Sequence, residues 1–394
     1  MHQAILSLVK LVEVSPHASP YQNADILPLP PSRRTWTRKT FIFFWLATAI
    51  NIAEWSGAST ALAIGLTVGQ AIAVNAISTF IICLALVISG HGGGKWHIPF
   101  AIINRTGWGI RGAWFTLCNR IILSCCWYGV QSWYGGQMVK IMIGAIWPSF
   151  YNMKNTFGPN EFMKTNEFVA FVIFWTISLP VFLLRPEHYR IPAMVSSVLV
   201  TIAAFTLFIW ALAKQGNVGP LWNDPETVYG VGRLSGSKLS WAMMRMITSG
   251  IGGWAGGILY QSDFSRYAVH PGDQIWGQIF IIPVCLFGSN ILGIITTSCA
   301  RGFYPNDPLL WKLYDLLEAI QLHEGTSGAR AAVFFAAFAF FLSQVSVNVV
   351  ACGVVGGMDL AALLPSASRL STYVADLVPV QPVQPVPILA LVLS

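Results

Sequence analysis

Long apolar segments separated by short polar stretches set the pattern of this chain. A membrane-spanning helix needs about 20 mostly apolar residues. Eight segments meet this requirement: Phe41–Leu66, Gln70–Gly90, Ala113–Trp147, Glu167–Leu184, Ile191–Ala213, Trp241–Gln261, Gln274–Cys299 and Ala331–Cys352. The third is longer than a bilayer is thick, so we expect part of it to tilt or project. The pattern predicts an all-α, multi-pass integral membrane protein.

Composition supports this class and excludes a soluble globular domain. Hydrophobic residues make up 55% of the 394 residues and charged residues only 10%, whereas soluble domains carry about 25% charged residues. The net charge of +7 comes mostly from Lys and Arg in loops beside the apolar segments. Membrane topology explains this charge more simply than a nucleic-acid partner, so we expect none.

The chain divides into three regions. Residues 1–39 form a polar, Pro-rich arm whose basic residues at Arg33–Lys39 precede the first span, which predicts a cytoplasmic N-terminus. Residues 40–365 form the transmembrane domain. Residues 366–394 form an atypical tail whose repeat VPVQPVQPVP favours polyproline II. Between spans seven and eight, Pro308–Leu322 has one apolar face and predicts an amphipathic helix lying at the outer surface.

Two enzyme-like motifs are rejected. The string SGHGGGKW at Ser89–Trp96 departs from the phosphate loop GxxxxGK[ST] and joins two apolar spans. Its HGGG resembles a lipase oxyanion loop, but the chain has no GxSxG motif. We therefore expect a flexible loop here and no enzyme activity. The seven cysteines show no zinc-binding spacing, so no metal site is expected.

The sixth span contains a dense glycine cluster, SGIGGWAGG at Ser249–Gly257. Glycine costs about 1 kcal/mol inside a helix relative to alanine, so such a cluster indicates either close helix packing or a broken helix. The density favours an unwound segment that lines a cavity, with Trp254 at its centre.

The third span contains WYGVQSWYGG, in which Trp127 and Gln131 are spaced i,i+4 and share one helix face. The indole can stack on a flat heterocycle, and the carboxamide can read the donor or acceptor edge of that ring. Taken alone, a packed interfacial aromatic beside a packed amide is the simpler interpretation.

Polar residues in spans one and eight suggest a coupling site. Asn51 and Glu54 are spaced i,i+3, and Glu54 is the only acidic residue of its span, which makes it a candidate proton carrier or a neutral structural glutamate. Span eight carries five polar or polarisable positions: Ser343, Gln344, Ser346, Asn348 and Cys352. Ser343 and Ser346 can coordinate a cation, although hydroxyls that bond back to their own helix explain them equally well.

Taken together, these motifs resemble the nucleobase:cation symporter-1 family, and most closely its fungal Fur-type branch. The resemblance runs from Asn23 to Pro365. It rests on NADILPLPPSRRTW, INRTGWGIRGAW, WYGVQSWYGG, GGWAGGILYQSDFSRYA and SQVSVNVVACGVVGGMDLAALLP. It implies a fold of two inverted five-helix repeats in which helices one and six are broken, and cation-coupled alternating access.

The resemblance also implies site residues. Trp127 and Trp254 enclose the substrate ring, and Gln131 hydrogen-bonds its edge. The remaining substrate-site positions are Asn51, Asn348 and Cys352, where Cys352 replaces the family's asparagine. The family's sodium-site positions are Ala47, Ile50, Ser343, Ser346 and Val347.

Two further expectations concern coupling and gating. Val347 lacks the hydroxyl that sodium needs, so we expect a co-transported proton, carried by Glu54, and no other cofactor. Asp263 and Arg266 are expected at the cytoplasmic mouth, where they meet the N-terminal arm as a gate.

The leading hypothesis is a proton-coupled permease, in the plasma membrane, for a nucleobase, nucleoside or related heterocycle such as uracil, allantoin, uridine or thiamine. The sequence after Leu364 no longer resembles a family that normally has twelve spans, so the second repeat is expected to be incomplete. Two alternatives follow from this: a truncated product that keeps the ligand site but does not transport, which is what we expect of the chain as written, or a non-transporting sensor. Uptake and binding assays distinguish these hypotheses.

Overall fold

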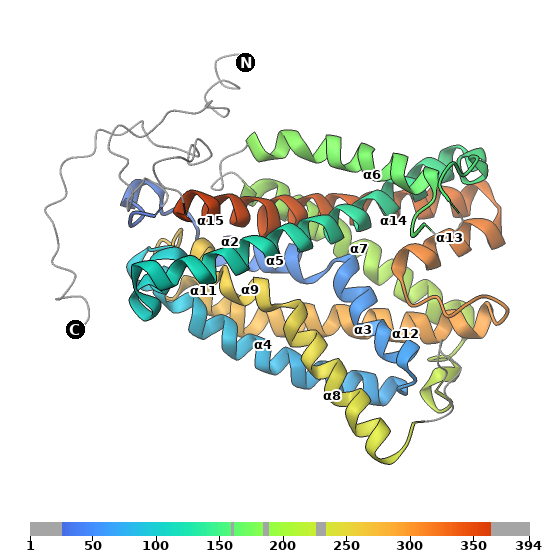
Figure 1. Ribbon diagram of the computed structural model, residues 1–394. Helices are drawn as coiled ribbons and strands as arrows, with labels where there is room; N and C mark the ends of the chain where they lie inside the picture. Colours follow the sequence, from blue (N-terminus) through green and yellow to red (C-terminus); the bar gives the residue numbers. More distant parts are fainter. Residues whose placement is uncertain (1–25, 159–160, 184–188, 226–233, 364–394) are drawn as a thin grey trace, which may run out of the picture.

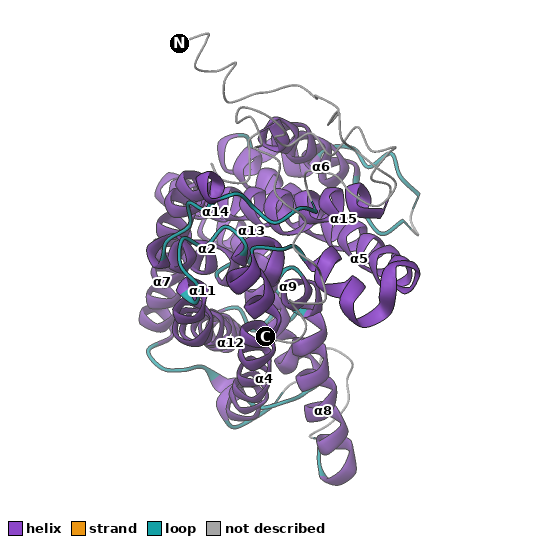
Figure 2. Cartoon of the chain, turned by 90° about the vertical axis from the view of Figure 1, so that its left-hand side faces the viewer, coloured by secondary structure: helices purple, strands orange, loops and turns teal. Residues whose placement is uncertain are grey.

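The computed structural model describes residues 26–158, 161–183, 189–225 and 234–363. Its long helices run side by side as a bundle (Figures 1 and 2). The first half contains α2 (Arg38–Ala49), α3 (Ile52–Ile64), α4 (Val68–Trp96), α5 (Phe100–Ile146), α6 (Thr165–Ser178) and α7 (Arg190–Gln215). The second half contains α8 (Gly236–Gly253), α9 (Ala255–Leu259), α10 (Gln261–Ser265), α11 (Asp273–Trp276), α12 (Gly288–Phe303), α13 (Leu313–Glu324), α14 (Ser327–Ser346) and α15 (Val355–Leu363).

Short helical segments connect or extend these helices. Among the described residues, four are 3-10 helices: η1 (Pro31–Arg33), η2 (Pro148–Asn152), η3 (Leu179–Leu183) and η5 (Pro220–Trp222). Three are π-helical: η6 (Gly277–Ile281) and η7 (Pro283–Phe287), which join α11 to α12, and η8 (Val347–Val354), which joins α14 to α15.

Over the described residues, the eight apolar segments expected from the sequence fold as helices, either continuous or broken. Among the described residues, five helices are long and apolar enough to cross a membrane: Val68–Trp96, Thr165–Phe182, Ile191–Gln215, Asp273–Phe303 and Ser327–Leu363. The first and sixth segments are each broken into shorter helices. The third lies within the 47-residue α5 except for Trp147, which is the C-cap of that helix. This helix begins at Phe100, earlier than expected, because it continues on both sides of a kink at Gly109, whose φ of 70° favours glycine.

Both breaks lie where polar or glycine residues interrupt the apolar pattern. Between α2 and α3, Asn51 is extended (φ −149°, ψ 173°) and its side chain caps α3 by accepting from the Glu54 backbone N–H at 3.0 Å. Between α8 and α9, Trp254 leaves the helical conformation (φ −96°, ψ 2°) directly after Gly253. The expected interruptions of helices one and six are therefore present.

The expectation of a flexible loop at Ser89–Trp96 is wrong, because these residues form the last turns of α4. Their glycines permit close packing against α10 and α11. A Cβ atom on Gly93 would lie 2.3 Å from Ser265 Oγ, and one on Gly94 would lie 2.6 Å from Gln274 Nε2. The Ser265 hydroxyl also donates to the Gly90 carbonyl at 2.7 Å. Helix packing therefore outweighs the low helix propensity of glycine at this position.

The amphipathic helix between spans seven and eight is also placed differently from the prediction. It is α13, and its apolar face packs inside the protein, where Leu313, Leu316 and Leu317 are at most 1% exposed. On its polar side, Glu318 forms an ion pair with Lys140 of α5, with 2.8 Å between Lys140 Nζ and Glu318 Oε2. Protein surrounds this apolar face. The expectation that the helix lies on a lipid surface is therefore wrong.

The described part of the N-terminal arm packs against the segment after α10. The Trp36 backbone N–H donates to the Tyr267 carbonyl at 2.9 Å, and the Val269 N–H donates to the Trp36 carbonyl at 3.0 Å. The Trp36 ring is 1% exposed and stacks on Phe264. The rest of the arm, residues 1–25, and the tail at 366–394 lie outside the described residues.

Candidate functional site

A cavity lies where four segments meet: the middle of α5, the α2–α3 break, the α8–α9 break and η8. The cavity is open to solvent, and the empty space in and around its opening amounts to about 620 Å³. Broken helices leave backbone groups without helical partners, and such groups are tolerated within a membrane where they line a cavity. The fold therefore brings its two breaks to one place.

One face of α5 supplies a wall of this cavity. Arg120, Ser124, Trp127 and Gln131 all line it, and their spacing of three, four or seven residues places them on the same side of the helix. The face carries a cation, a hydroxyl, an indole and a carboxamide in that order. The predicted pair of Trp127 and Gln131 thus faces the same space.

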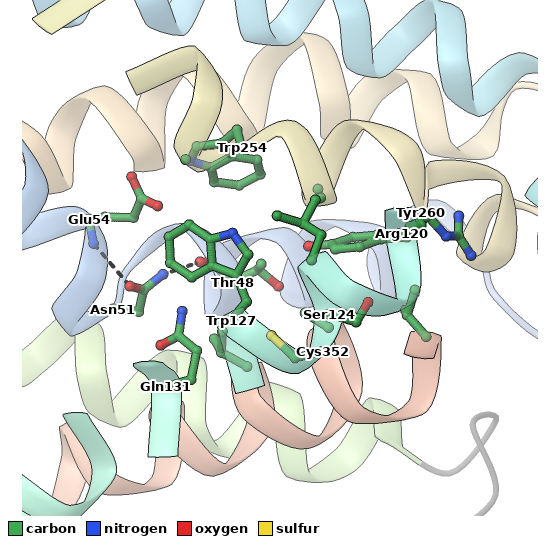
Figure 3. A pocket seen from close by; sticks show the side chains of 17 residues that line it. Thr48, Asn51, Glu54, Arg120, Ser124, Trp127, Gln131, Trp254, Tyr260 and Cys352 are labelled. Atoms are coloured by element: carbon green, nitrogen blue, oxygen red, sulfur yellow. Dashed lines mark hydrogen bonds between the residues drawn. The ribbon is translucent and has the colours of Figure 1, made fainter. Parts of the chain in front are cut away.

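Trp254 faces this wall from the α8–α9 break. In Figure 3 its indole lies above that of Trp127, with the cavity side chains arranged around them. The flanking Gly253 and Gly256 also line the cavity. A Cβ atom on Gly253 would meet nothing within 4 Å, and one on Gly256 would meet only a Leu123 methyl group at 3.8 Å. The glycines therefore keep the space beside Trp254 open.

Asn51 and Glu54 line the cavity from the α2–α3 break. The Asn51 amide spans the break, because its Nδ2 donates to the Thr48 carbonyl at 2.6 Å while its Oδ1 accepts from Glu54 N–H. Both bonds appear as dashed lines in Figure 3. Asn51 thus already holds the two half-helices together, and Glu54 contributes a carboxyl group to the cavity.

The η8 segment supplies Val347, Ala351 and Cys352 to the cavity. Asn348, which the sequence placed in the substrate site, does not line it. Its side chain is 0% exposed and its Nδ2 donates to Ser132 Oγ of α5 at 2.9 Å. Its position on η8 turns it toward α5, so the structure gives it a packing contact.

The expected cation positions lie beside the cavity. The Ser343 hydroxyl donates to the Ile50 carbonyl at 3.0 Å, and the Ser346 hydroxyl lies 3.3 Å from that of Ser196 in α7. Ala47 belongs to α2, but its side chain lies outside the described set. Ser343 and the Ile50 carbonyl therefore lie where α14 packs against the end of α2, whereas Ser346 faces α7.

A buried ion cluster that was not predicted from the sequence has Arg120 as its central residue, and Arg120 lines the cavity. Arg120 donates to Asp263 of α10 at 2.7 Å and forms a bidentate pair with Asp359 of α15. Arg120 is 2% exposed and both carboxylates are 1% exposed. Arg120 was detectable as a charged residue in the middle of an apolar span. Thr48, Ser124 and Tyr260 also line the cavity but carry no distinctive spacing.

The two predicted gate residues have different surroundings. Asp263 binds Arg120 and also accepts from the Phe100 backbone N–H at 3.0 Å. Arg266 is 2% exposed, its guanidinium lies over the Tyr267 ring, and its carbonyl lies 2.9 Å from His97 Nδ1. The arm reaches this segment through Trp36. A gating role for the pair stays a prediction.

This arrangement can bind a flat ring with a polar edge. Two indoles supply stacking faces, and Gln131 supplies a hydrogen-bonding edge. The cavity contains no cluster of His, Cys, Asp and Glu of the kind that holds a metal ion, as far as the described residues extend. The two indoles and the carboxamide are groups that bind a ring by stacking and hydrogen bonding.

Comparison with known proteins agrees with this chemistry. Residues 28–381 match the profile of a family described as permeases for cytosine and purines, uracil, thiamine and allantoin. An uncharacterised permease of Schizosaccharomyces pombe is 32% identical over 90% of this chain and 59% of its own length. The allantoin permease of Saccharomyces cerevisiae is 32% identical over 87% of this chain and 53% of its own length. The chain thus spans between half and three fifths of the length of these relatives.

A solved structure has the same fold. It is Mhp1, a nucleobase-cation-symport-1 family transporter in a closed conformation with bromovinylhydantoin bound. The TM-score is 0.62 at 18% identity, over 90% of this chain and 72% of that chain. The predicted transporter fold is therefore confirmed. The family and these relatives are transporters and not enzymes, as the sequence predicts.

Proposed function

Because the chain belongs to the family of permeases for cytosine and purines, uracil, thiamine and allantoin, we propose that it binds a planar heterocycle of this class and carries it across the plasma membrane with a proton. The single observation that carries the proposal is the pair of indoles, Trp127 and Trp254, on two sides of one cavity with Gln131 beside them.

The binding step follows from the chemistry of these side chains. Stacking a base on an aromatic ring contributes about 1–3 kcal/mol, and the two indoles come from α5 and from the α8–α9 break. Gln131 is 5% exposed, so a hydrogen bond that it makes to the ligand is shielded from water. The ligand is therefore a flat ring with a polar edge.

The coupling step is assigned to Glu54. Its carboxyl group lines the same cavity as the ring site, so binding of the solute and protonation of Glu54 can influence each other. Val347 presents no hydroxyl to a metal cation at the neighbouring position. Both features support a proton over sodium.

Uptake and binding are measured side by side to test the proposal. The chain is expressed in a yeast host that lacks its own permeases, and uptake of labelled uracil, cytosine, hypoxanthine, allantoin and thiamine is followed. Binding of the same solutes is measured with purified protein. Saturable binding together with uptake of at least one solute supports the proposal and contradicts the expectation from the sequence that the chain as written does not transport. Binding without uptake contradicts transport, and absence of both contradicts the proposal as a whole.

The role of Glu54 as the proton carrier is tested by a substitution at this residue. Glu54→Gln keeps the shape of the side chain but cannot cycle a proton, so we expect bound solute but uptake that no longer depends on external pH. Glu161→Gln, at an exposed glutamate in the segment before α6, is the matched control and should keep the pH dependence. Normal pH-dependent uptake by Glu54→Gln rules out the carrier role.

A further inference from the structure

The carboxamide of Gln131 is held from behind by a second glutamine. Gln344 Nε2 of α14 donates to the Gln131 backbone carbonyl at 3.1 Å and also to the Gln131 side-chain Oε1. Gln344 is 0% exposed and does not line the cavity. A buried side chain from another helix therefore contacts the predicted ring-reading group on the side away from the ligand.

The hydrogen-bonding pattern fixes which atom of each amide is which. The Gln131 backbone carbonyl can only accept, so the Gln344 atom that faces it must be the NH₂ group. The same NH₂ group faces the end of the Gln131 side chain, so that end must be the oxygen. The reversed orientation of Gln344 would place its oxygen against two other oxygens. The Gln131 Nε2 then points away from Gln344, and in Figure 3 this nitrogen points toward the cavity.

We infer that Gln344 is a positioning residue that locks the Gln131 carboxamide with its NH₂ group toward the ligand. The site then selects a heterocycle that presents a hydrogen-bond acceptor, such as a ring carbonyl, to α5. A ligand with an amino group there sets donor against donor and leaves both without a partner. This inference deepens the proposed function and rests on it for the ligand, while the locked amide itself belongs to the protein alone.

Ligand pairs that differ in a carbonyl and an amino group test the selectivity. Hypoxanthine with adenine, and uracil with cytosine, are compared by the dissociation constants of the purified protein. We expect the carbonyl member to bind about tenfold tighter or better, as for one unpaired polar group. Gln344→Met keeps the volume but frees Gln131 to rotate, so this ratio should fall toward one.

The matched control is Gln321→Met. Gln321 is a buried glutamine of α13 whose Nε2 donates to the Ile141 carbonyl of α5 at 3.1 Å, away from the cavity. It should lower stability without changing the ratio. A wild-type preference for the amino member, or an unchanged ratio in Gln344→Met, overturns the inference.

A ligand-free measurement separates this inference from the proposed function. At pH 8, Gln131→Glu still offers an acceptor to Gln344, whereas Gln344→Glu places a carboxyl group against two acceptors. We expect Gln344→Glu to lower the unfolding temperature by several degrees more than Gln131→Glu. Equal losses, or the reverse order, overturn the locked orientation. If no solute binds but this order is found, the proposed function fails and the locked amide stands.

Discussion

Arg120 in α5 donates to Asp263 in α10 across 2.7 Å, and neither side chain is more than 2% exposed. Asp359 of α15 binds the same guanidinium, and the Phe100 ring lies 4.3 Å from it. Three segments that are distant in the sequence therefore meet at one charge beside the cavity. Because one cation faces two carboxylates in a site with little water, each member of the cluster depends on the others.

Replacement of Arg120 by leucine is expected to destabilise the fold strongly. It leaves Asp263 and Asp359 buried without their cation, and breaking a buried pair in this way costs about 3–5 kcal/mol. The readout is thermal unfolding in detergent. Arg245→Leu, at an exposed arginine of α8, is the control and should change little. Equal unfolding temperatures for the two variants would show that the cluster does not hold these helices together.

Two glycine substitutions should have opposite effects. Gly253→Val directs its side chain into open cavity space, so the protein should fold normally but lose solute binding. Gly135→Ala places a Cβ atom 2.2 Å from the Phe174 ring, and such overpacking costs about 1–3 kcal/mol. Unfolding temperature and solute binding are measured for both. Unimpaired binding by Gly253→Val would contradict the placement of the ligand beside Trp254.

The two glycine clusters show how far the sequence predicts this structure. The cluster around Trp254 predicts a break, and the break is present. The cluster at Gly92–Gly94 has similar composition but lies inside a continuous helix. The difference comes from the neighbours, because Ser265 and Gln274 need the space that these glycines leave. Such tertiary contacts override local propensity and are not readable from composition.

In the site, too, the sequence predicts local relationships between residues but not those that depend on tertiary packing. The i,i+4 spacing of Trp127 and Gln131 predicts that they share a face, and both line the cavity. The partners of Arg120 lie 143 and 239 residues away in the chain, so no local pattern connects them. Asn348 shares a helix with Cys352, but only Cys352 of the two faces the cavity. Which polar side chain of a helix meets ligand depends on helix rotation, and this comes from packing.

A pH-dependent contribution to stability is expected from Glu324 at the end of α13. Its hydrogen bond with Lys214 holds the pKa of Glu324 below its ordinary value. A carboxyl group with a lowered pKa in the folded state stabilises the protein above its unfolded pKa of about 4.3. This stabilisation is lost as the pH falls through the lower pKa of the folded state.

Unfolding temperatures measured from pH 6 to pH 3 test this contribution. Wild type should exceed Glu324→Gln at pH 6, and the two curves should converge toward pH 3. The control is Glu161→Gln, which should run parallel to wild type. A difference between wild type and Glu324→Gln that does not change with pH would contradict the assignment.

The most direct test of the central claim is the dissociation constant of the tightest-binding solute for Trp127→Leu and Trp254→Leu. The solutes are uracil, cytosine, hypoxanthine, allantoin and thiamine, and Trp241→Leu is the control because Trp241 is 72% exposed and lies away from the cavity. Loss of one stacking face, worth about 1–3 kcal/mol, should weaken binding by about 5- to 150-fold in each cavity variant. Trp241→Leu should bind as wild type does. Wild-type affinity in both cavity variants would contradict a ring held between Trp127 and Trp254.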